Sequence, residues 1–361
     1  MTAQPEELPG SEQTRGAVSQ QAVALELPAA RLQERDRLLL GLALIVALVA
    51  PWILHTPYWL NLLVLICIYA IVNQSWNLIM GYAGIWSFGQ LALFGVGAYT
   101  SALMSYHYGI SPFIGTIAGA VAAVLASMVL GLPSLRLRGA YVVLLTLAFH
   151  ELLRNLITND TTKWTGGGFG LFGFGQYGLK ELPQLERMMI FYYVALILLV
   201  LTNVIIWRIL ASPLGLAFRA LRDAEPYAVA RGIPEYRFKL LVFAISAFFT
   251  GLAGAFYANF LDAVGPSIFD FGLMMNLLAM IVIGGWGTFW GPMIGTVLLL
   301  YLNEVLRDFD QWRVLIFGLL MIIFVILLPQ GLIRPLETIT RRIGTRLGRP
   351  DARAASEATR G

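Results

Sequence analysis

Charged side chains are scarce in this sequence of 361 residues, which excludes an ordinary soluble globular domain. Asp, Glu, Lys and Arg make up only 13% of the chain, whereas about 25% is usual in such domains. Hydrophobic residues make up 58%, and the mean hydropathy is +0.73. This composition predicts an integral membrane protein with an all-α, polytopic fold.

Cysteine and histidine are also rare, which excludes most disulfide and metal chemistry. The single cysteine, Cys67, cannot form a disulfide within the chain and is expected to be a small buried hydrophobe. His55, His107 and His150 are scattered and have no partner at metal-ligand spacing. We therefore expect no metal and no other cofactor. Without a nucleophile beside a base, or a carboxylate pair, we also expect no enzymatic activity.

Long apolar stretches dominate the rest of the chain. A spanning helix needs about 20 mostly apolar residues, because each residue adds about 1.5 Å across a core about 30 Å thick. We identify ten candidate spans, which are Leu38–Leu54, Tyr58–Met80, Trp86–Tyr106, Pro112–Leu132, Gly139–Ile157, Met188–Leu210, Tyr236–Leu261, Phe271–Gly285, Gly291–Leu306 and Trp312–Leu328. The second and third are either plain spans or broken elements, since five glycines interrupt "GYAGIWSFGQLALFGVGAY".

The distribution of Lys and Arg predicts the orientation, because cytoplasmic loops hold the excess of these residues. With the N-terminus inside, 19 of the 25 Lys and Arg residues lie on the cytoplasmic side. Residues 1–36 are polar and predict a disordered cytoplasmic tail. The first apolar stretch starts too late for a secretory signal, so we expect it to be retained. A transmembrane domain at 37–335 and a basic cytoplasmic tail at 336–361 complete the predicted organisation.

The longest outside loop, about Thr158 to Arg187, is rich in glycine. It lacks the G-x-x-x-x-G-K-[ST] pattern of a phosphate-binding loop. It is either a flexible surface loop or a loop that docks an extracytoplasmic partner.

A charged insert lies between two apolar blocks, and its sequence is "SPLGLAFRALRDAEPYAVARGIPEYRFKLL". Apolar residues recur at helical spacing, and they are Leu214, Phe218, Leu221, Ala224 and Ala228. Charges on the other side predict the ion pairs Arg219–Asp223 and Arg222–Glu225. Pro226 suits the first turn of a second short helix, and Gly232 suits its end. The helix either lies in the lipid headgroups or docks a protein.

The stretch "GLAFRALRDAEPYAVARGIPEYRFKLLVFAISAFFTGLAGAFYA" resembles the LivM-type permeases of branched-chain amino acid ATP-binding cassette importers. Further stretches match that family in the same order, namely "GYAGIWSFGQLALFGVGAY", "LPSLRLRGAYVVLLTLAFHELLR", "VIGGWGTFWGPMIG" and "LLPQGLIRP". The resemblance covers nearly all of the chain after the first apolar stretch.

The resemblance implies a coupling helix at about 212–234 that docks into a groove on an ATPase subunit. The residues expected in this role are Leu214, Phe218, Arg219, Leu221, Arg222, Asp223, Glu225 and Gly232. "EPYAVARG" resembles the E-A-A-x-x-x-G element of importer permeases, but Pro226 and Tyr227 replace the two alanines and Gly232 comes one place late. The element's detailed contacts are therefore not carried over.

The resemblance also implies partners and a location. These are a second related permease, two cytoplasmic ATPases and a periplasmic binding protein, in the lipid bilayer of a bacterial inner membrane and without nucleic acid. The implied cargo is branched-chain amino acids, with urea or short amides as the alternative.

Polar and small residues within the spans have two possible roles. Ser87, Gln90, Asn73 and Asn77 either line a substrate path or hydrogen-bond between helices, and the family likeness favours Ser87 and Gln90 for the path. Helix packing through small residues at four-residue spacing is expected at three pairs, which are Gly115 and Gly119, Gly251 and Ala255, and Gly291 and Gly295.

An ion-coupled secondary transporter is the alternative from another class. It would need ionisable groups near the middle of the membrane, and the candidate spans offer almost none. Glu151 and Arg154, three residues apart, are either a proton-carrying site or an ion pair near the interface.

Overall fold

The computed structural model describes residues 45–53, 56–137, 139–175, 177–307, 313–327 and 331–332. The two predicted tails, His55, and parts of the first and last candidate spans lie outside these ranges. The chain divides into units at 1–48 and 49–361, and the second unit is described below.

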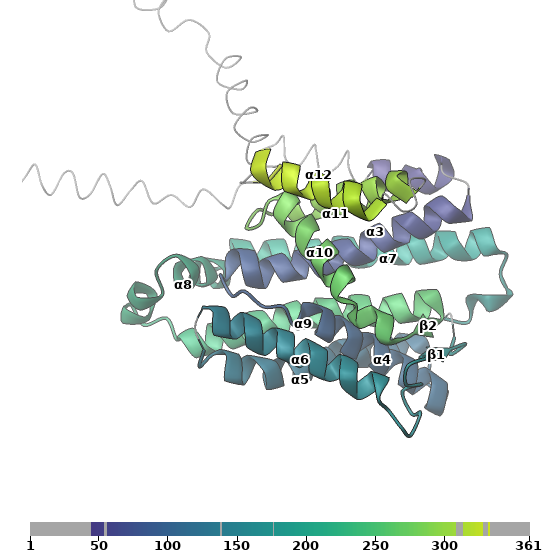
Figure 1. Ribbon diagram of the computed structural model, residues 1–361, viewed down its shortest axis with the longest axis horizontal. Coiled ribbons are helices and arrows are strands. Elements are labelled where there is room, and N and C mark those ends of the chain that lie inside the picture. Colours follow the sequence, from purple (N-terminus) through teal and green to yellow (C-terminus); the bar gives the residue numbers. More distant parts are fainter. Residues whose placement is uncertain are drawn as a thin grey trace, which may run out of the picture. The chain divides into compact units, whose positions relative to one another are not determined.

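Helices make up nearly all of the regular structure (Figure 1). They are α3 (Pro57–Asn77), η1 (Leu78–Tyr82), α4 (Gln90–Tyr108), α5 (Pro112–Ser134), α6 (Ala140–Thr158), η2 (Leu179–Glu181), α7 (Gln184–Ala211), α8 (Pro213–Ala230), α9 (Glu235–Leu261), η3 (Pro266–Phe269), α10 (Phe271–Gly284), α11 (Gly291–Val305) and α12 (Arg313–Leu327). Two short strands, β1 (Leu171–Phe172) and β2 (Ala263–Val264), pair antiparallel.

Five of the described helical segments are long and apolar enough to cross a membrane. They are α3 continued by η1, then α5, α6, α7 and α9, whereas α10 and α11 are apolar but shorter. The prediction of an all-α membrane protein with several spans is therefore confirmed. The count of ten spans and the sidedness of the termini stay predictions.

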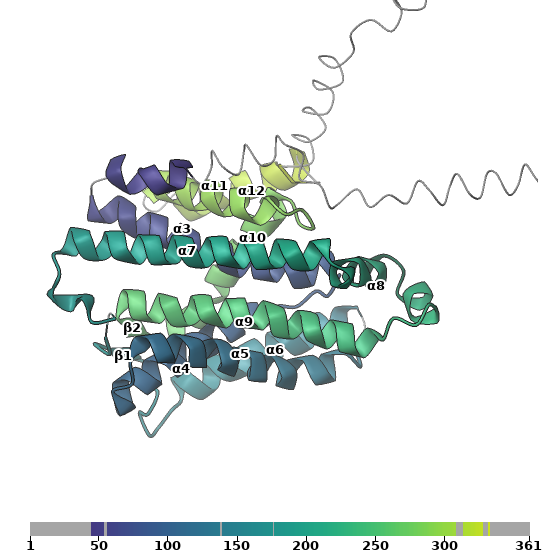
Figure 2. The ribbon, with the colours of Figure 1, turned by 180° about the vertical axis from the view of Figure 1, so that it is seen from behind.

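Three helices, α4, α5 and α9, form the most tightly packed part of this unit (Figure 2). A Cβ added to Gly119 would lie 2.5 Å from the carbonyl oxygen of Gly97 and 2.9 Å from the Cβ of Ala255. A Cβ on Gly115 would lie 2.8 Å from the Oγ of Ser101. One on Gly251 would overlap Ala123. Because these positions lack side chains, the three backbones touch directly.

The α10–α11 hairpin is packed in the same way. A Cβ added to Gly295 would overlap the carbonyl oxygen of Met280, and one on Gly291 would overlap that of Gly285. All three predicted small-residue pairs therefore lie at contacts between helices.

The second and third candidate spans are broken rather than plain. The α3 helix ends in the π-helical turn η1, and α4 begins only at Gln90. Residues 83–89 between them are not helical, and Gly84 has a φ of +71°, which favours glycine. The predicted third span therefore started too early, because Trp86 to Gly89 belong to this connection.

The glycine-rich loop between α6 and α7 is held by specific contacts. Leu171 pairs with Val264 in the two-stranded sheet. Asp262 accepts a hydrogen bond from the backbone N–H of Gly175 at 2.8 Å and forms an ion pair with Lys180 at 2.8 Å. These contacts tie the loop to the end of α9, and both its flexibility and its docking of a partner stay predictions.

Candidate functional site

The charged insert folds as an amphipathic helix, α8, whose apolar side packs against the protein. Phe218 is 1% exposed, and Leu221 and Ala228 are buried as well. The Phe218 ring contacts that of Phe238 on α9, with 6.3 Å between ring centroids. Three residues of the predicted apolar stripe are thus buried against the protein, whereas Leu214 and Ala224 are partly exposed. A contact of the other side of α8 with lipid headgroups or with a docked protein stays a prediction.

A kink divides α8 into two helices, as Pro226 predicts. Ala224 has φ −154° and ψ 68°, which lies outside the helical region, and Pro226 follows at the start of the second helix. That helix ends at Ala230, and Gly232 follows just after it with a φ of +86°. The N–H of Gly232 donates to the carbonyl of Val229 at 2.9 Å. The N–H of Ile233 donates to the carbonyl of Ala228 at 3.1 Å, which satisfies another carbonyl of the last turn.

The charged residues of α8 bind other partners than those predicted. Arg219 donates to the carbonyl oxygen of Leu210 at 3.1 Å and so binds the end of α7, where carbonyl groups lack helical partners. Asp223 pairs instead with the adjacent Arg222 at 2.8 Å, so the predicted Arg219–Asp223 pair is wrong. Glu225 pairs with Lys239 of α9 at 2.9 Å, because the kink at Ala224 separates it from the helical face of Arg222.

Arg222 also connects α8 to the break after α3. Its Nη1 donates to the carbonyl oxygen of Gly81 in η1 at 2.7 Å. A Cβ added to Gly84 would lie 2.6 Å from the Cγ of Arg222 and 3.3 Å from its Cα. The glycine therefore lets α8 approach the connection closely.

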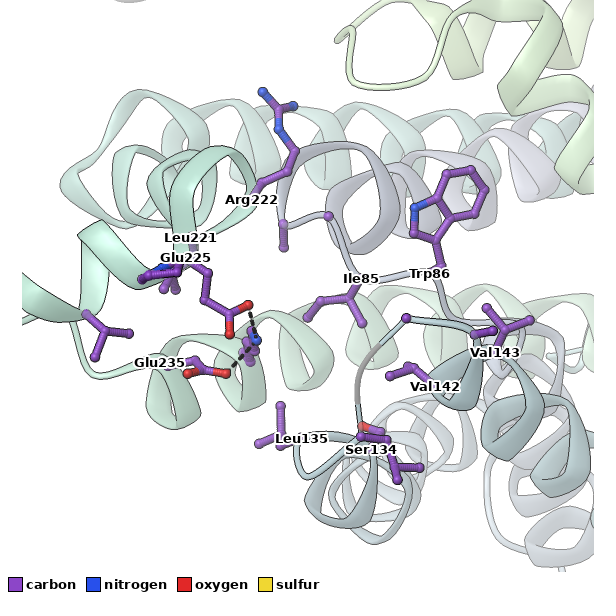
Figure 3. A pocket seen from close by; sticks show the side chains of 18 residues that line it. Ile85, Trp86, Ser134, Leu135, Val142, Val143, Leu221, Arg222, Glu225 and Glu235 are labelled. Carbon is purple, nitrogen blue, oxygen red and sulfur yellow. Dashed lines mark hydrogen bonds and ion pairs between the residues drawn. The ribbon is translucent and has the colours of Figure 1, made fainter.

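A cavity of about 720 Å³ lies between α8, the connection after η1 and the first turns of α6 and α9. Ile85, Val142 and Leu221 form part of its apolar wall. On another side, Glu225 and Glu235 point into the same region (Figure 3), and Lys239 binds both, at 2.9 Å and 2.6 Å. The cavity thus joins an apolar surface to a set of paired charges.

Two of the predicted path residues, Asn73 and Asn77, bind α3 to the α10–α11 hairpin. The Oδ1 of Asn77 accepts from the N–H of Gly287 at 2.7 Å, and its Nδ2 donates to the carbonyl of Thr288 at 2.8 Å. The Nδ2 of Asn73 donates to the hydroxyl of Thr296 at 2.7 Å. Both asparagines are buried, so hydrogen bonding between these segments is their observed role.

The other two predicted path residues, Ser87 and Gln90, are buried against different partners. The Nε2 of Gln90 donates to the hydroxyl of Ser246, and its Oε1 accepts from Thr250 at 3.2 Å. The carbonyl of Ser87 accepts from the indole of Trp76 at 2.8 Å. The four predicted path residues therefore do not share one contact, since Asn73 and Asn77 bind the α10–α11 hairpin and the other two bind α9 and α3. A role in lining a path stays a prediction.

Comparison with known proteins identifies the family. A family model described as "Branched-chain amino acid transport system / permease component" matches residues 58–325. The chain belongs to this family of permeases. It is 35% identical over 323 residues to the "High-affinity branched-chain amino acid transport system permease protein LivM" of Escherichia coli (strain K12), covering 83% of this chain and 75% of that protein.

Two further relatives of this permease carry similar names. The protein of the same name from Salmonella typhimurium is 33% identical over 327 residues, which are 83% of this chain and 75% of the relative. The "Probable branched-chain amino acid transport permease protein LivM" of Methanocaldococcus jannaschii is 26% identical over 336 residues, or 76% of this chain and 92% of the relative. No solved structure matches this chain.

Sequence reasoning missed several residues that shape this region of the permease. Lys239 is the cation that binds two carboxylates, and its spacing four residues after Glu235 was a visible signal. The glycine pattern indicates only that Gly81 and Gly84 interrupt a helix. No local pattern relates them to Arg222, which lies 141 residues beyond Gly81.

The remaining ionisable groups have simpler surroundings. Glu151 and Arg154 lie 3.6 Å apart, and both side chains are more than a third exposed, so they form the paired charge that was one of two interpretations. The Nε2 of His150 lies 3.0 Å from the carbonyl oxygen of Phe269. Cys67 is buried, as expected. Within the described ranges, no three His, Cys, Asp or Glu side chains are placed to hold a metal ion.

Proposed function

We propose that this permease is the membrane subunit of an ATP-binding cassette importer and conducts branched-chain amino acids across a bacterial inner membrane. The match of the family model over residues 58–325 carries this proposal, and the names of the relatives support the cargo. In this function the chain catalyses no bond change, and ATP is hydrolysed by partner subunits.

The proposed ATPase contact is the outward side of α8. While its apolar stripe is buried, Tyr227 is 75% exposed and Leu216 is 52% exposed. Exposed apolar side chains among charges are typical of protein contacts, since an aromatic residue can fill a groove while charges select the partner. This arrangement supports a helix that docks into an ATPase and would place α8 and both termini in the cytoplasm.

The glycine-rich loop is the proposed contact for a periplasmic binding protein. The α7 helix runs from this loop to α8, so the two features lie at opposite ends of one long helix (Figure 1). Phe169 of the loop is 91% exposed. A second related permease and two ATPases complete the proposed assembly.

Uptake into proteoliposomes tests the function. The full assembly is reconstituted with the binding protein, and leucine uptake is measured with ATP, without ATP, and with an ion gradient alone. We expect uptake only when ATP, the ATPases and the binding protein are all present. Uptake driven by the ion gradient alone would reject the importer and favour a secondary transporter. Competition of leucine with valine, isoleucine, urea and acetamide identifies the cargo.

A further inference from the structure

Three segments that are distant in the sequence meet around the break after α3. The carbonyl of Gly81 in η1 accepts from Arg222 of α8 at 2.7 Å. On the other side of the turn, Asn77 accepts from the N–H of Gly287 in the α10–α11 connection at 2.7 Å. The coupling helix and this connection thus hold the same turn from two sides.

Close packing leaves this junction little slack. A Cβ added to Gly81 would lie 2.5 Å from the nitrogen of Gly287, and one added to Gly287 would lie 3.6 Å from the Nη1 of Arg222. The rings of Trp86 and Trp286 lie 4.8 Å apart, and they join the connection after η1 to the α10–α11 connection a second time. Through this turn, Arg222 of α8 is therefore linked to both connections.

Arg222 is well suited to transmit such a displacement. Its Nε is held by Asp223 at 2.8 Å, so the guanidinium is oriented from its own helix while Nη1 reaches Gly81. A bond from a charged donor is stronger than a neutral one. Its acceptor belongs to a π-helical turn, which is a rare element and is frequently found at functional sites.

We infer that Arg222 is a positioning residue that transmits movement of α8 to the broken end of α3, and so couples ATPase closure to reshaping of the turn at Gly81. The inference rests on the proposed function, because it assumes that an ATPase moves α8. It assigns Arg222 to force transmission rather than to the docking surface, where Tyr227 and Leu216 lie.

The test measures leucine imported per ATP hydrolysed in the complete reconstituted importer. Arg222→Ala removes the bond to Gly81, and we expect the ratio to fall about tenfold, the effect of losing one charged hydrogen bond, while the ATPases still co-purify. Arg222→Lys keeps a cationic donor and should restore part of the ratio, which a role in bulk packing would not predict. Arg237→Gln, a change at an exposed cation of α9, is the control and should leave the ratio unchanged.

A second variant reaches the same contact from the other side. Gly84→Ala places a methyl group against Arg222 and strains a backbone with φ +71°, so it should also lower the ratio. Because both changes act on one contact, the double variant should be less impaired than the product of the two single effects. If Arg222→Ala does not fold, Gly84→Ala and Arg222→Lys carry the test.

Two results would overturn the inference. If folded Arg222→Ala imports as much leucine per ATP as the wild type, the contact transmits nothing. If Arg222→Ala does not fold, a wild-type value in both Gly84→Ala and Arg222→Lys would lead to the same conclusion. Loss of the ATPases from Arg222→Ala would instead place this side chain in the docking surface. Failure of the proposed function looks different, because the wild-type permease itself would then show no ATP-dependent import.

Discussion

The α4–α5–α9 core and the junction around α8 are held together by different means. In the core, glycine backbones touch, and the added Cβ atoms considered above would meet neighbouring backbone or small side chains. At the junction, glycines also allow close approach, but hydrogen bonds join α8, η1 and the α10–α11 connection, and an ion pair joins α8 to α9. A cavity of about 720 Å³ lies beside α8. Direct backbone contact favours one rigid arrangement, whereas a small set of polar bonds beside a cavity permits two.

The largest effect is expected when the core is overpacked. Gly119→Leu would force side-chain atoms against the carbonyl of Gly97 and the Cβ of Ala255, and we expect a loss of about 3 kcal/mol or failure to fold. The yield of monodisperse protein and the melting temperature in detergent measure this. Gly318→Leu is the matched helical control, since an added Cβ there meets no described atom within 4 Å. Equal stability of the two variants would contradict the rigid-core interpretation.

The next largest effect concerns the docking surface. Tyr227→Asp should weaken ATPase binding by roughly 30-fold, which is the loss expected for an aromatic hot spot of about 2 kcal/mol. ATPase co-purification and a binding titration measure it. Phe169→Asp is the control, because it alters an exposed aromatic residue of the glycine-rich loop between α6 and α7 and should leave ATPase binding intact. Retention of the ATPases by Tyr227→Asp would reject α8 as the contact.

A smaller and more local effect is expected at Lys239. Lys239→Met removes the cation between Glu225 and Glu235, so the second half of α8 should lose about 1–3 kcal/mol of local stability. Hydrogen exchange should become faster at residues 225–232, while the α4–α5–α9 core remains protected. Faster exchange throughout the chain would mean that the junction and the core are not independent.

The smallest effect is expected at Asp160 in the glycine-rich loop. The Thr162 hydroxyl, together with the backbone and hydroxyl of Thr165, donates to this carboxylate and holds its pKa well below the usual range. Because the pKa is lower in the folded loop than in the unfolded chain, ionised Asp160 stabilises the folded loop at pH values above the unfolded pKa of about 3.9. This contribution is lost as the pH falls from that value towards the folded pKa. Asp160→Asn should therefore speed amide exchange at Thr162 and Thr165 at pH 7, with no change elsewhere. Unchanged exchange at those amides would show that the carboxylate does not order the loop.

Local patterns predicted the interruptions at Pro226 and Gly232, and they gave a break among the glycines after Met80 as one of two interpretations. The kink before Pro226, the stop at Gly232 and the break among the glycines at 81–89 all follow from backbone restrictions that act within a few residues. Helical periodicity likewise identified Phe218 and Leu221 as inward-facing. Such features depend on neighbours in the sequence, so a single sequence contains them.

The partners of the charged residues could not be predicted in the same way. The spacing of Arg219 and Asp223 suits an ion pair, but Arg219 binds the unpaired carbonyl of Leu210 instead. Arg222 binds the backbone carbonyl of Gly81 in η1. Because every residue has a backbone carbonyl, the sequence pattern does not indicate which one Arg222 binds. Reversing the charges of Arg219, Arg222 and Asp223 together would therefore disturb the fold as well as the proposed docking. Tyr227→Asp changes only an exposed side chain of the proposed docking surface, so it tests docking alone.

The length of α7 has a consequence for the proposed contact between α8 and an ATPase. Arg187 and Arg208 lie 21 residues apart on this helix of 28 residues, a rise of about 31 Å that matches the hydrocarbon thickness of about 30 Å. In the proposed orientation, a helix of this length would carry Ser212 and α8 beyond the acyl chains. A water-soluble ATPase could then contact α8 without deforming the bilayer.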